Sequence, residues 1–411
     1  MKICYAQRRE LYTFYIQNST LYIQHRHIVR LTPNFASARI LTMSSHQPTG
    51  EDPRYLQEQI ITYLGNKRRL LDFIGKAVLQ VRERMGGRKL RCFDAFSGSG
   101  IVSRYLKQHA ELLFSNDLES YARILNTCYL ANRDIVSQAK LPELHAHLLQ
   151  QIEQNLAPGM LAAYYAPQDD THICPGERVF YTRRNAIYLD TARRCIGALP
   201  EAMQPFFLAP LLCEASVHTN TAGIFKGFYK DKSGIGKFGG RGANALQRIL
   251  APIELPLPIF SRFDCENHVL QSDATAAAAT LPELDLAYLD PPYNQHPYGS
   301  NYFMLNLLLQ NKEPQQISRV SGIPADWNRS PYNKRAQVQQ ALDKLLHTLP
   351  ARFILISYNS EGFIPLPEMQ QLLGRHGKFQ VMETDYATFR GCRNLCARAL
   401  SVKEYLFLLE K

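Results

Sequence analysis

Short apolar runs alternate with segments of helical spacing in two parts of this chain, residues 55–132 and 263–411. The runs LRCFD (90–94) and LLFS (112–115) predict buried strands, and each is followed by a stretch with the spacing of a helix. Residues 55–85, which precede the first run, also repeat apolar positions at helical spacing from Arg68 onward. An order of strand, turn, helix and strand predicts a parallel sheet covered by helices.

The alternation is interrupted between residues 133 and 262. Helical pieces there are separated by proline-rich joints such as PIELPLPIF, and one loop is rich in glycine and lysine. The alternation returns with several apolar runs, one of them directly before Asp290 and the last at the C-terminal VKEYLFLLEK. We therefore expect residues 55–132 and 263–411 to form one α/β domain, into which a mainly helical region, 133–262, is inserted.

The first ~42 residues, up to Met43, differ from the rest in their pattern. They are basic, show no clear periodicity and lack the apolar core of a secretory signal peptide. We expect residues 1–54 to be a poorly ordered extension. Because Met43 is followed by the polar segment SSHQPTGEDP, we hypothesise that Met43 is the natural start. Intact-mass measurement on the native protein tests this hypothesis.

The composition favours a polyanionic partner. Lys and Arg exceed Asp and Glu by 11, and the isoelectric point is about 9.1. An excess of this size favours nucleic acid, although basic proteins without such a partner are also common. The nine cysteines include no CxxC pair, which is typical of reduced thiols in a cytoplasmic protein and offers no zinc-like spacing. No apolar run reaches the ~18 residues of a membrane span.

Candidate ligand-binding residues follow the first two predicted strands. In FDAFSGSG (93–100), Gly98 and Gly100 allow the backbone to approach a ligand at a helix N-terminus. The spacing matches neither the GxGxxG fingerprint nor a Walker A loop, and an ordinary tight turn explains it as well. Asp117 ends the second strand, where an acid can bind ribose hydroxyls or cap a helix. The two features together favour a cofactor that contains adenosine.

A rigid polar turn follows the apolar run LAYL (286–289). Pro291 and Pro292 lack a backbone N–H, so the strand stops at Asp290. The Asp290 carboxylate and the carbonyl at Pro291 can accept hydrogen bonds from an exocyclic amine, and Tyr293 offers a flat face for stacking. The motif therefore favours a site for a planar base with an amino group, and a structural turn capped by the aspartate is the alternative.

These blocks, in this order, resemble those of the Dam-like (alpha-group) N6-adenine-specific DNA methyltransferases. The matching blocks are YLGNKR (63–68), FDAFSGSG (93–100), SNDLES (115–120), QSDA (271–274), DPPYNQ (290–295), ISYNSEGFI (356–364) and YATFRG (386–391). The resemblance implies a Rossmann-like class I methyltransferase fold: a mostly parallel twisted sheet with helices on both faces, and an inserted DNA-recognition region. It also implies S-adenosyl-L-methionine as cofactor, double-stranded DNA as partner and the N6 amine of a flipped-out adenine as methyl acceptor.

The resemblance also implies roles for individual residues. For the cofactor it implies contacts from Tyr63, Lys67, Asp94, Phe96, Gly98, Gly100, Asp117, Asp273 and Asp290. Within this set, Asp94, Phe96 and the glycines shape the methionine pocket, Asp117 binds the ribose, and Asp273, at the end of a predicted strand, lies near the cofactor adenine. For the target base it implies Asp290, Pro291, Pro292 and Tyr293. Tyr63 departs from members that have Trp at this position, but it keeps an aromatic ring.

The loop TNTAGIFKGFYKDKSGIGKFGGRGAN (219–244) combines glycines, cations and aromatic rings. Cations neutralise phosphates, glycines allow close approach, and aromatic rings stack on bases. We expect DNA contact from Lys226, Lys230, Lys232, Lys237 and Arg241, with a solvated surface loop as the alternative. Arg390 and the segment WNRSPYNKR (327–335) are weaker candidates for contact with the DNA backbone.

Other functions stay open on the sequence alone. The acceptor can be adenine in RNA or the N4 amine of cytosine, and a DNA-binding module with a degenerate cofactor pocket is a further alternative. Aspartate before Pro-Pro-Tyr favours adenine, and the intact glycines and acids of the motifs argue against a degenerate pocket. We expect a cytoplasmic monomer without a metal ion. It would be a solitary methylase or the modification enzyme of a restriction–modification system whose endonuclease is a separate protein.

Overall fold

A computed structural model of the chain describes residues 50–387 and 401–411, apart from Ile60, Arg241, Gly242 and Asn244. Before residue 50 it describes three strands, β1 (Lys2–Gln7), β2 (Glu10–Gln17) and β3 (Thr20–His25). The chain forms two compact units, Met1–Thr49 and Gly50–Lys411.

The three N-terminal strands pair antiparallel in the order β1-β2-β3. The sequence analysis predicts no regular elements here, because the segment lacks clear periodicity. Its strands KICYAQ, ELYTFYIQ and TLYIQH are nevertheless rich in β-branched and aromatic residues, which favour strands. The status of residues 1–54 as an extension, and Met43 as the natural start, stay predictions.

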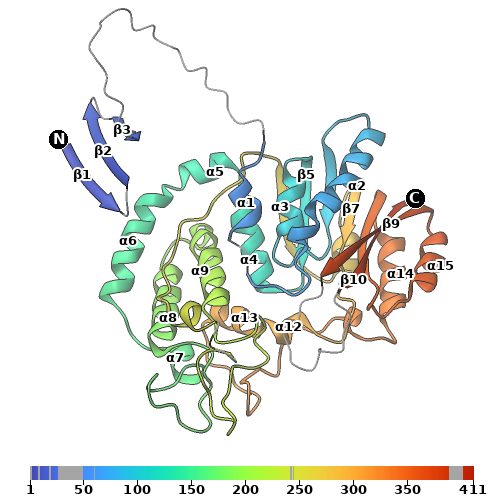
Figure 1. The fold of residues 1–411 in the computed structure, drawn as a ribbon. Coiled ribbons are helices and arrows are strands. Elements are labelled where there is room, and N and C mark those ends of the chain that lie inside the picture. The colour runs from blue at the N-terminus through green and yellow to red at the C-terminus, as the bar shows by residue number, and fades with distance from the viewer. Residues whose placement is uncertain are drawn as a thin grey trace, which may run out of the picture. The chain divides into compact units, whose positions relative to one another are not determined.

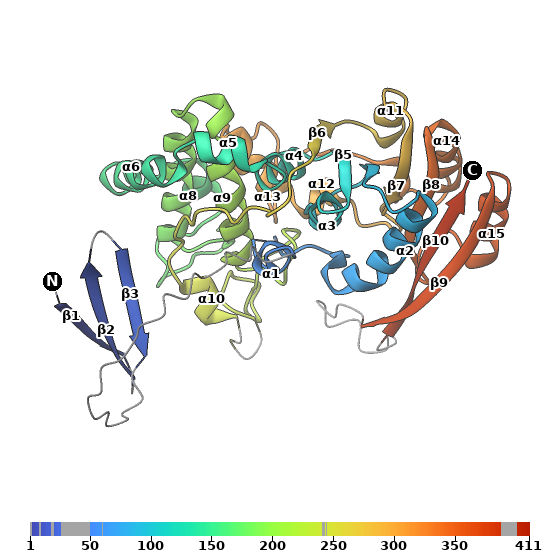
Figure 2. The ribbon, with the colours of Figure 1, turned by 90° about the horizontal axis from the view of Figure 1, so that it is seen from above.

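Residues 50–411 contain a seven-stranded sheet (Figures 1 and 2). Its strands are β4 (Leu90–Asp94), β5 (Ala110–Asp117), β6 (Glu266–Gln271), β7 (Leu284–Leu289), β8 (Ala351–Asn359), β9 (Lys378–Ala387) and β10 (Ser401–Glu410). In space the order is β6-β5-β4-β7-β8-β10-β9. Within this sheet the strands run parallel except β10, which is antiparallel to both of its neighbours. The mostly parallel sheet confirms the predicted α/β fold class.

Helices cover both faces of this sheet, as predicted. One face is covered by the helices α2 (Leu71–Arg84), which follows the 3-10 turn η1 (Lys67–Leu70), and α3 (Ile101–Lys107). The other face is covered by α11 (Ala274–Ala278), α14 (Val338–Thr348) and α15 (Leu366–Gly374). In α2 the buried residues Ile74, Val78 and Val81 recur at the helical spacing that the sequence shows, because they are the residues that meet the sheet.

The central strands determine where the polar residues of the motifs lie. β7 is buried along its whole length, as expected for a central parallel strand, and it ends at Leu289 before the two prolines. Its neighbour β4 ends at Asp94, in register with Tyr288. Asp94 and Asp290 are therefore at the same edge of the sheet, which is the edge where ligands bind in open α/β sheets.

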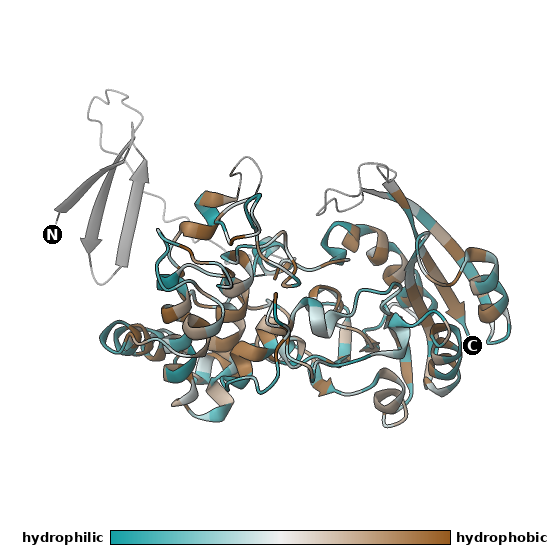
Figure 3. Cartoon of the chain, turned by 90° about the horizontal axis from the view of Figure 1, so that it is seen from below, coloured by the Kyte–Doolittle hydropathy of each residue, from teal (hydrophilic) through white to brown (hydrophobic). Residues whose placement is uncertain are grey.

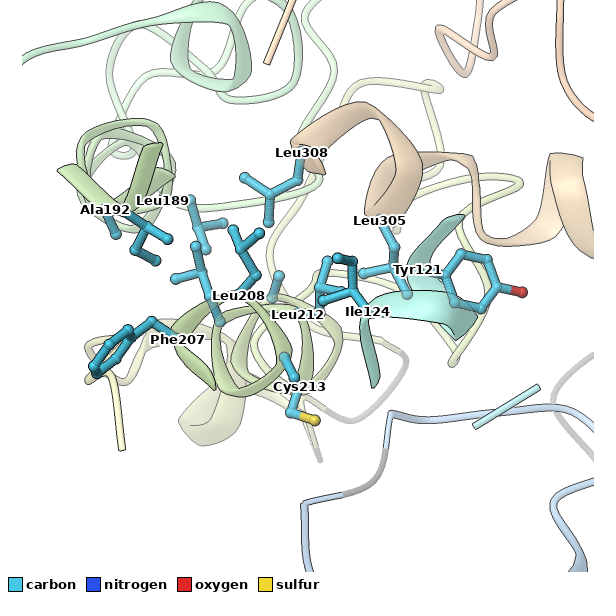
Figure 4. Packing of buried hydrophobic residues seen from close by; sticks show 14 of the residues in the cluster. Tyr121, Ile124, Leu189, Ala192, Phe207, Leu208, Leu212, Cys213, Leu305 and Leu308 are labelled. Carbon is cyan, nitrogen blue, oxygen red and sulfur yellow. The ribbon is translucent and has the colours of Figure 1, made fainter. Parts of the chain in front are cut away.

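The regular elements described in residues 133–262 are helices. They are α5 (Arg133–Gln138), α6 (Leu141–Gln154), α7 (Met160–Tyr164), α8 (Arg183–Gly197), η2 (Glu201–Met203), α9 (Pro205–Val217) and α10 (Leu246–Leu250). With α4 (Ser120–Tyr129) and α13 (Phe303–Gln310), several of these helices enclose one apolar cluster around α9, part of which is shown in Figure 4. Figure 3 shows hydrophobic residues concentrated in these inner helices. Because the cluster continues into α4 and α13, the domain boundaries at 133 and 262 stay a prediction.

Three short elements complete the described part: α1 (Pro53–Gln57), α12 (Tyr298–Asn301) and η4 (Pro331–Asn333). Two details differ from the sequence analysis. The strand predicted to end at Asp273 ends at Gln271, because Asp273 instead caps α11 and its Oδ1 accepts the Thr275 N–H (2.9 Å). The sequence pattern does not predict β9, because this strand lies at the edge of the sheet and leaves alternate side chains exposed.

Candidate active site

Two cavities lie side by side at the edge of the sheet where β4, β5 and β7 end. The larger, about 680 Å³, has the size of a small-molecule site and reaches Asp117 at the end of β5. The smaller lies between η1 and the loop that follows β4. Tyr63, Phe96 and Asp290 line both cavities, so a ligand in one cavity is close to a ligand in the other.

The loop after β4 requires two of its glycines. Gly98 has φ +50° and Gly100 has φ +80°, in the left-handed region that favours glycine. A Cβ on Gly98 would lie 2.8 Å from Tyr63 Cε1, and one on Gly100 would lie 2.6 Å from Asn126 Oδ1. The Gly98 N–H donates to Asp117 Oδ2 (2.8 Å). Three predicted cofactor residues, Gly98, Gly100 and Asp117, therefore belong to one structural unit.

Asp94 is a buried carboxyl in the wall of the smaller cavity. Its Oδ2 accepts a hydrogen bond from Ser103 Oγ (2.6 Å), and its Oδ1 has no hydrogen-bond partner among the described residues. Burial raises the pKa of Asp94 to about 7; the hydrogen bond from Ser103 opposes this rise and the Asp290 carboxylate adds to it. A buried acceptor at a cavity wall fits a cationic ligand group, such as the ammonium of the methionine part of S-adenosylmethionine.

The larger cavity combines acceptors with an aromatic wall. Besides Asp290 and the tyrosines, its polar lining residues are Asn116, Asp117, Glu119, Ser272, Asp273, Asn328, Ser330 and Asn333. The rings of Phe96 and Tyr332 meet edge to face, with centroids 5.0 Å apart. Both residues that the resemblance assigns to the cofactor adenosine, Asp117 and Asp273, line this cavity. A few polar groups beside an apolar wall suit a nucleoside.

Lys67 lines the smaller cavity, but its ammonium is paired within the protein. Lys67 Nζ lies 3.1 Å from Asp290 Oδ1 and 2.8 Å from Glu404 Oε1. The side chains of Lys67 and Glu404 are 4% and 3% exposed. Burial lowers the pKa of Lys67, but the charges of Asp290 and Glu404 outweigh it, so the pKa lies well above its usual range. Lys67 therefore stays charged beside the DPPY motif.

Asp290 is partly buried, and its carboxylate is influenced by both neighbours. Burial raises the pKa of Asp290 to about 6, the Lys67 ammonium lowers it, and the Glu404 carboxylate raises it. At neutral pH the Asp290 carboxylate is therefore mostly ionised and can accept hydrogen bonds.

The loop after β7 is held in place by the neighbouring strand β8 and the segment that follows it. Tyr293 O accepts the Phe363 N–H (3.0 Å), and the Tyr293 ring packs edge-on against Tyr358 (centroids 6.0 Å apart). Pro291 is buried, and Pro292 lines the larger cavity. The four DPPY residues therefore have a supported geometry at the junction of the two cavities.

Tyr298 and Tyr302 belong to the site although the sequence analysis does not name them. The Tyr63 ring stacks on Tyr298 (4.9 Å) and on Tyr302 (4.8 Å). Leu64 N–H donates to Tyr302 Oη (2.7 Å), and Tyr298 Oη donates to Leu64 O (3.0 Å). These contacts fix the segment that carries Tyr63 and Lys67. The available signal was the spacing of four between the two tyrosines, which places them on one side of a helix.

The segment 327–335 lies in part at the larger cavity. Asn328, Ser330, Tyr332 and Asn333 line the larger cavity. Asn333 Nδ2 also donates to Asn294 O (2.8 Å), which ties the segment to the loop after β7. The basic residues of this segment led to the prediction of contact with the DNA backbone. Its amide, hydroxyl and aromatic side chains are the sequence features that could have indicated a ligand cavity.

The loop at 219–240 has exposed lysines, and buried residues hold it against the rest of the protein. Lys226, Lys230, Lys232 and Lys237 are exposed. Phe225 is buried in the helical cluster. Asn220 is buried, and its Nδ2 donates to Val179 O (2.8 Å) and to Lys237 O (3.0 Å). The loop therefore presents cations in a defined place, which a phosphate backbone can use. Arg241 and Arg390 lie outside the described residues.

In the described ranges, no group of three or more His, Cys, Asp or Glu side chains is arranged to hold a metal ion. Among the same residues, no helix combines the length and the apolar character that crossing a membrane requires.

The fold and the site together define the class of protein. The sheet is mostly parallel with β10 reversed, a glycine loop follows β4, an acid ends β5, and the polar turn DPPY follows β7. This is the arrangement of a Rossmann-like methyltransferase.

The chain belongs to the D12 class N6 adenine-specific DNA methyltransferase family, whose sequence profile matches residues 63–336. The type II methyltransferase M.NlaIII of Neisseria lactamica is 29% identical over 364 residues, 85% of this chain and 99% of that protein. M.CviAII of Paramecium bursaria Chlorella virus 1 is 28% identical over 85% of this chain and 98% of its own. M.FokI of Planomicrobium okeanokoites is 25% identical over 85% of this chain and 52% of its own. The structure of a magnesium protoporphyrin IX methyltransferase from Synechocystis PCC 6803 with bound SAM has a TM-score of 0.31 and 9% identity, over 85% of this chain and 86% of that one, a likeness too low to support an argument.

Family membership confirms several predictions. The chain is a DNA methyltransferase specific for adenine, its cofactor is S-adenosyl-L-methionine, and DNA is its substrate. Adenine in DNA, rather than adenine in RNA or cytosine, is therefore the acceptor class. The roles of the individual residues stay predictions.

Proposed function

We propose that this protein methylates the N6 amine of an adenine within a specific DNA sequence, and that Asp290, Pro291 and Tyr293 hold the flipped-out base. The observation that carries the proposal is the position of Asp290, which lines both cavities and so would lie beside the methyl-bearing sulfur that joins the methionine and adenosine parts of the cofactor. The base must leave the duplex, because its amine is otherwise base-paired and inaccessible to in-line attack.

The cofactor fits residues that already lie at the cavities. When bound, it supplies a methyl group attached to a positively charged sulfur. The unpaired Oδ1 of Asp94 would accept a hydrogen bond from the methionine ammonium of the cofactor. The glycine loop would leave room for the methionine part beside Asp94. Asp117 and Asp273 would accept hydrogen bonds from the ribose hydroxyls and from the exocyclic amine of the cofactor adenine.

The protein contributes mainly by positioning the amine. The lone pair of an exocyclic amine is delocalised into the ring, which makes the nitrogen a poor nucleophile. Hydrogen bonds from the amine to the Asp290 carboxylate and to Pro291 O favour a tetrahedral nitrogen and direct its lone pair at the methyl carbon. As the nitrogen–carbon bond formed, the carbon–sulfur bond of the bound cofactor would break and leave its electron pair on sulfur. The Asp290 carboxylate then accepts the surplus proton of the nitrogen.

Replacing Asp290 tests this assignment. In Asp290→Ala we expect methyl transfer to duplex DNA to fall by about 100-fold or more, because the acceptor for the amine is lost. Binding of DNA should change little. Labelled methyl groups are counted on duplex DNA and on RNA, and digestion to nucleosides separates N6-methyladenine from N4-methylcytosine. Asp385→Ala, at an exposed position of β9, is the matched control and should stay active. Near-normal turnover by Asp290→Ala would refute the role of Asp290.

We further propose that the protein is the modification enzyme of a restriction–modification system. The matched relatives carry names of type II methyltransferases and modification methylases, which supports this role. The endonuclease would be a separate protein, and a solitary methylase is the alternative. Sequencing that detects methylated bases, on DNA from cells with and without the protein, identifies the sites. Action as a monomer and in the cytoplasm stay predictions.

A further inference from the structure

Glu404 is a buried acid that has no role in methyl transfer as described above. It lies on β10, is 3% exposed and contacts the Lys67 ammonium at 2.8 Å. On the neighbouring strand β8, Ser357 Oγ donates to Glu404 Oε1 (3.2 Å). Burying a carboxylate is unfavourable unless it is paired and hydrogen-bonded, and Glu404 has both kinds of partner. Its place in the fold is therefore well defined.

Two carboxylates share one ammonium at this site. Lys67 contacts Asp290 at 3.1 Å as well as Glu404. Asp290 alone would neutralise Lys67, so neutralising the lysine does not explain the second acid. With both acids ionised, the group of three carries a net charge of −1. The surplus negative charge lies next to the side chain that must accept a hydrogen bond from the target amine.

We infer that Glu404 is a positioning residue for methyl transfer, which takes a share of the Lys67 ammonium and so leaves the Asp290 carboxylate free to accept the amine of the target base. The inference rests on the proposed function of Asp290. Glu404 acts through Lys67 and does not touch the base. Without Glu404, the ammonium would pair with Asp290 alone, and the carboxylate would be a weaker acceptor.

The titratable groups that surround Asp290 come from several elements. They are Lys67 of η1, Asp94 at the end of β4, Tyr288 of β7, Tyr293 of the following loop, Tyr298 of α12 and Glu404 of β10. The pKa of each of Tyr288 and Tyr298 is raised well above its usual range by burial, so these two groups stay neutral. Lys67 favours the ionised form of Asp290, and the acids Glu404 and Asp94 oppose it.

Glu404→Gln tests the inference, because glutamine keeps the shape and an acceptor oxygen but removes the charge. Losing this negative charge lowers the pKa of Asp290. We expect the acidic limb of the pH profile of kcat to move to lower pH by about one unit. The plateau of kcat should fall by about 10-fold, because Asp290 becomes a weaker acceptor and base. The KM values for DNA and cofactor should stay near those of the unaltered protein.

Two further variants separate this effect from loss of structure. Glu410→Gln removes another carboxylate from β10, one that pairs with Arg84 and Arg352, and it should leave the acidic limb in place. Ser357→Ala keeps the charge of Glu404 but removes its donor. The charge is then less neutralised, so we expect the limb to move slightly to higher pH, opposite in sign to Glu404→Gln. Ser357→Ala also carries the test if Glu404→Gln does not fold.

The outcomes distinguish the inference from the proposed function. If the unaltered protein transfers no methyl group to adenine in DNA, the proposed function fails. If it does, and Glu404→Gln binds cofactor normally but shows the unaltered acidic limb, the inference alone is overturned. A lower melting temperature with an unmoved limb would assign Glu404 a purely structural role. Shifts of opposite sign in Glu404→Gln and Ser357→Ala would support the inference.

Discussion

Two features of Gly98 disfavour any other residue: its left-handed backbone conformation and the lack of space for a side chain. Its φ is +50°, and an added Cβ would lie 2.8 Å from Tyr63 Cε1. We expect Gly98→Ala to lower the free energy of unfolding by about 1–2 kcal/mol for the backbone conformation alone. The ring of Tyr63 must also move, so cofactor affinity should fall by about 10-fold or more. Calorimetric titration with cofactor and thermal unfolding measure the two effects.

Gly86→Ala is the matched control for this prediction. Gly86 has φ +75°, and an added Cβ there meets no described atom within 4 Å. The control therefore has the backbone cost without the crowding. If both variants lose equal stability and bind cofactor equally well, the space beside Tyr63 has no role in the site.

The residues that the sequence predicts for the site are those next to strand ends. Asp94, Asp117 and Asp290 each follow or end an apolar run, and the carboxyl ends of parallel strands meet at one edge. Glu404 could not be predicted in this way. It lies inside the apolar strand VKEYLFLLE, where one charged residue is usually read as exposed. Only the position of β10 beside β8 brings Glu404 to Lys67.

At the scale of an element, the loop at 219–240 is the candidate surface for DNA. We expect Lys230→Ala and Lys237→Ala each to weaken DNA binding and to reduce the slope of log affinity against log salt by about one, because each lysine neutralises a phosphate. Cofactor affinity should not change. Fluorescence anisotropy with duplex DNA at several salt concentrations measures the slope.

Lys344→Ala provides the comparison for the loop variants. Lys344 is also exposed, but it lies on α14 against the sheet. Its removal changes the net charge of the protein by the same amount and should leave the slope almost unaltered. Equal slopes for all three variants would mean that the loop binds DNA no better than the rest of the surface.

Elements were predicted well where all their side chains share one environment, and poorly where some side chains are buried and others face solvent. β7 is buried on both faces, so its apolar run is continuous and its end is marked by prolines. β9 is an edge strand with alternate exposed residues, among them Val381, Glu383 and Asp385, so its apolar signal is weak. The segment 327–335 has basic residues that face solvent and polar residues that line a cavity, and composition does not separate these groups.

At the scale of the whole molecule, the apolar cluster around α9 joins the helical region to the sheet side. Leu212 of α9 is fully buried in this cluster together with Ile124 of α4 and Leu305 of α13 (Figure 4). We expect Leu212→Ala to lower the free energy of unfolding by about 2–5 kcal/mol. Because the cluster is continuous, residues 50–411 should still unfold in one transition at a lower temperature. Differential scanning calorimetry measures both quantities.

Leu250→Ala removes the same atoms from an exposed position. Leu250 is 41% exposed at the end of α10, so its loss should cost less than about 1 kcal/mol. Two separate transitions in Leu212→Ala, with only one of them shifted, would contradict a shared core. That result would instead favour an independent domain with the boundaries predicted at 133 and 262.

The position of β10 has a consequence for the timing of activity during protein synthesis. β10 comes after the other described strands along the chain, yet it lies between β8 and β9. Until it has left the ribosome, β8 has a bare edge and Lys67 lacks Glu404. A nascent chain that already carries the glycine loop and the DPPY motif therefore still lacks a finished site. We therefore expect chains that end before β10 to leave DNA unmethylated.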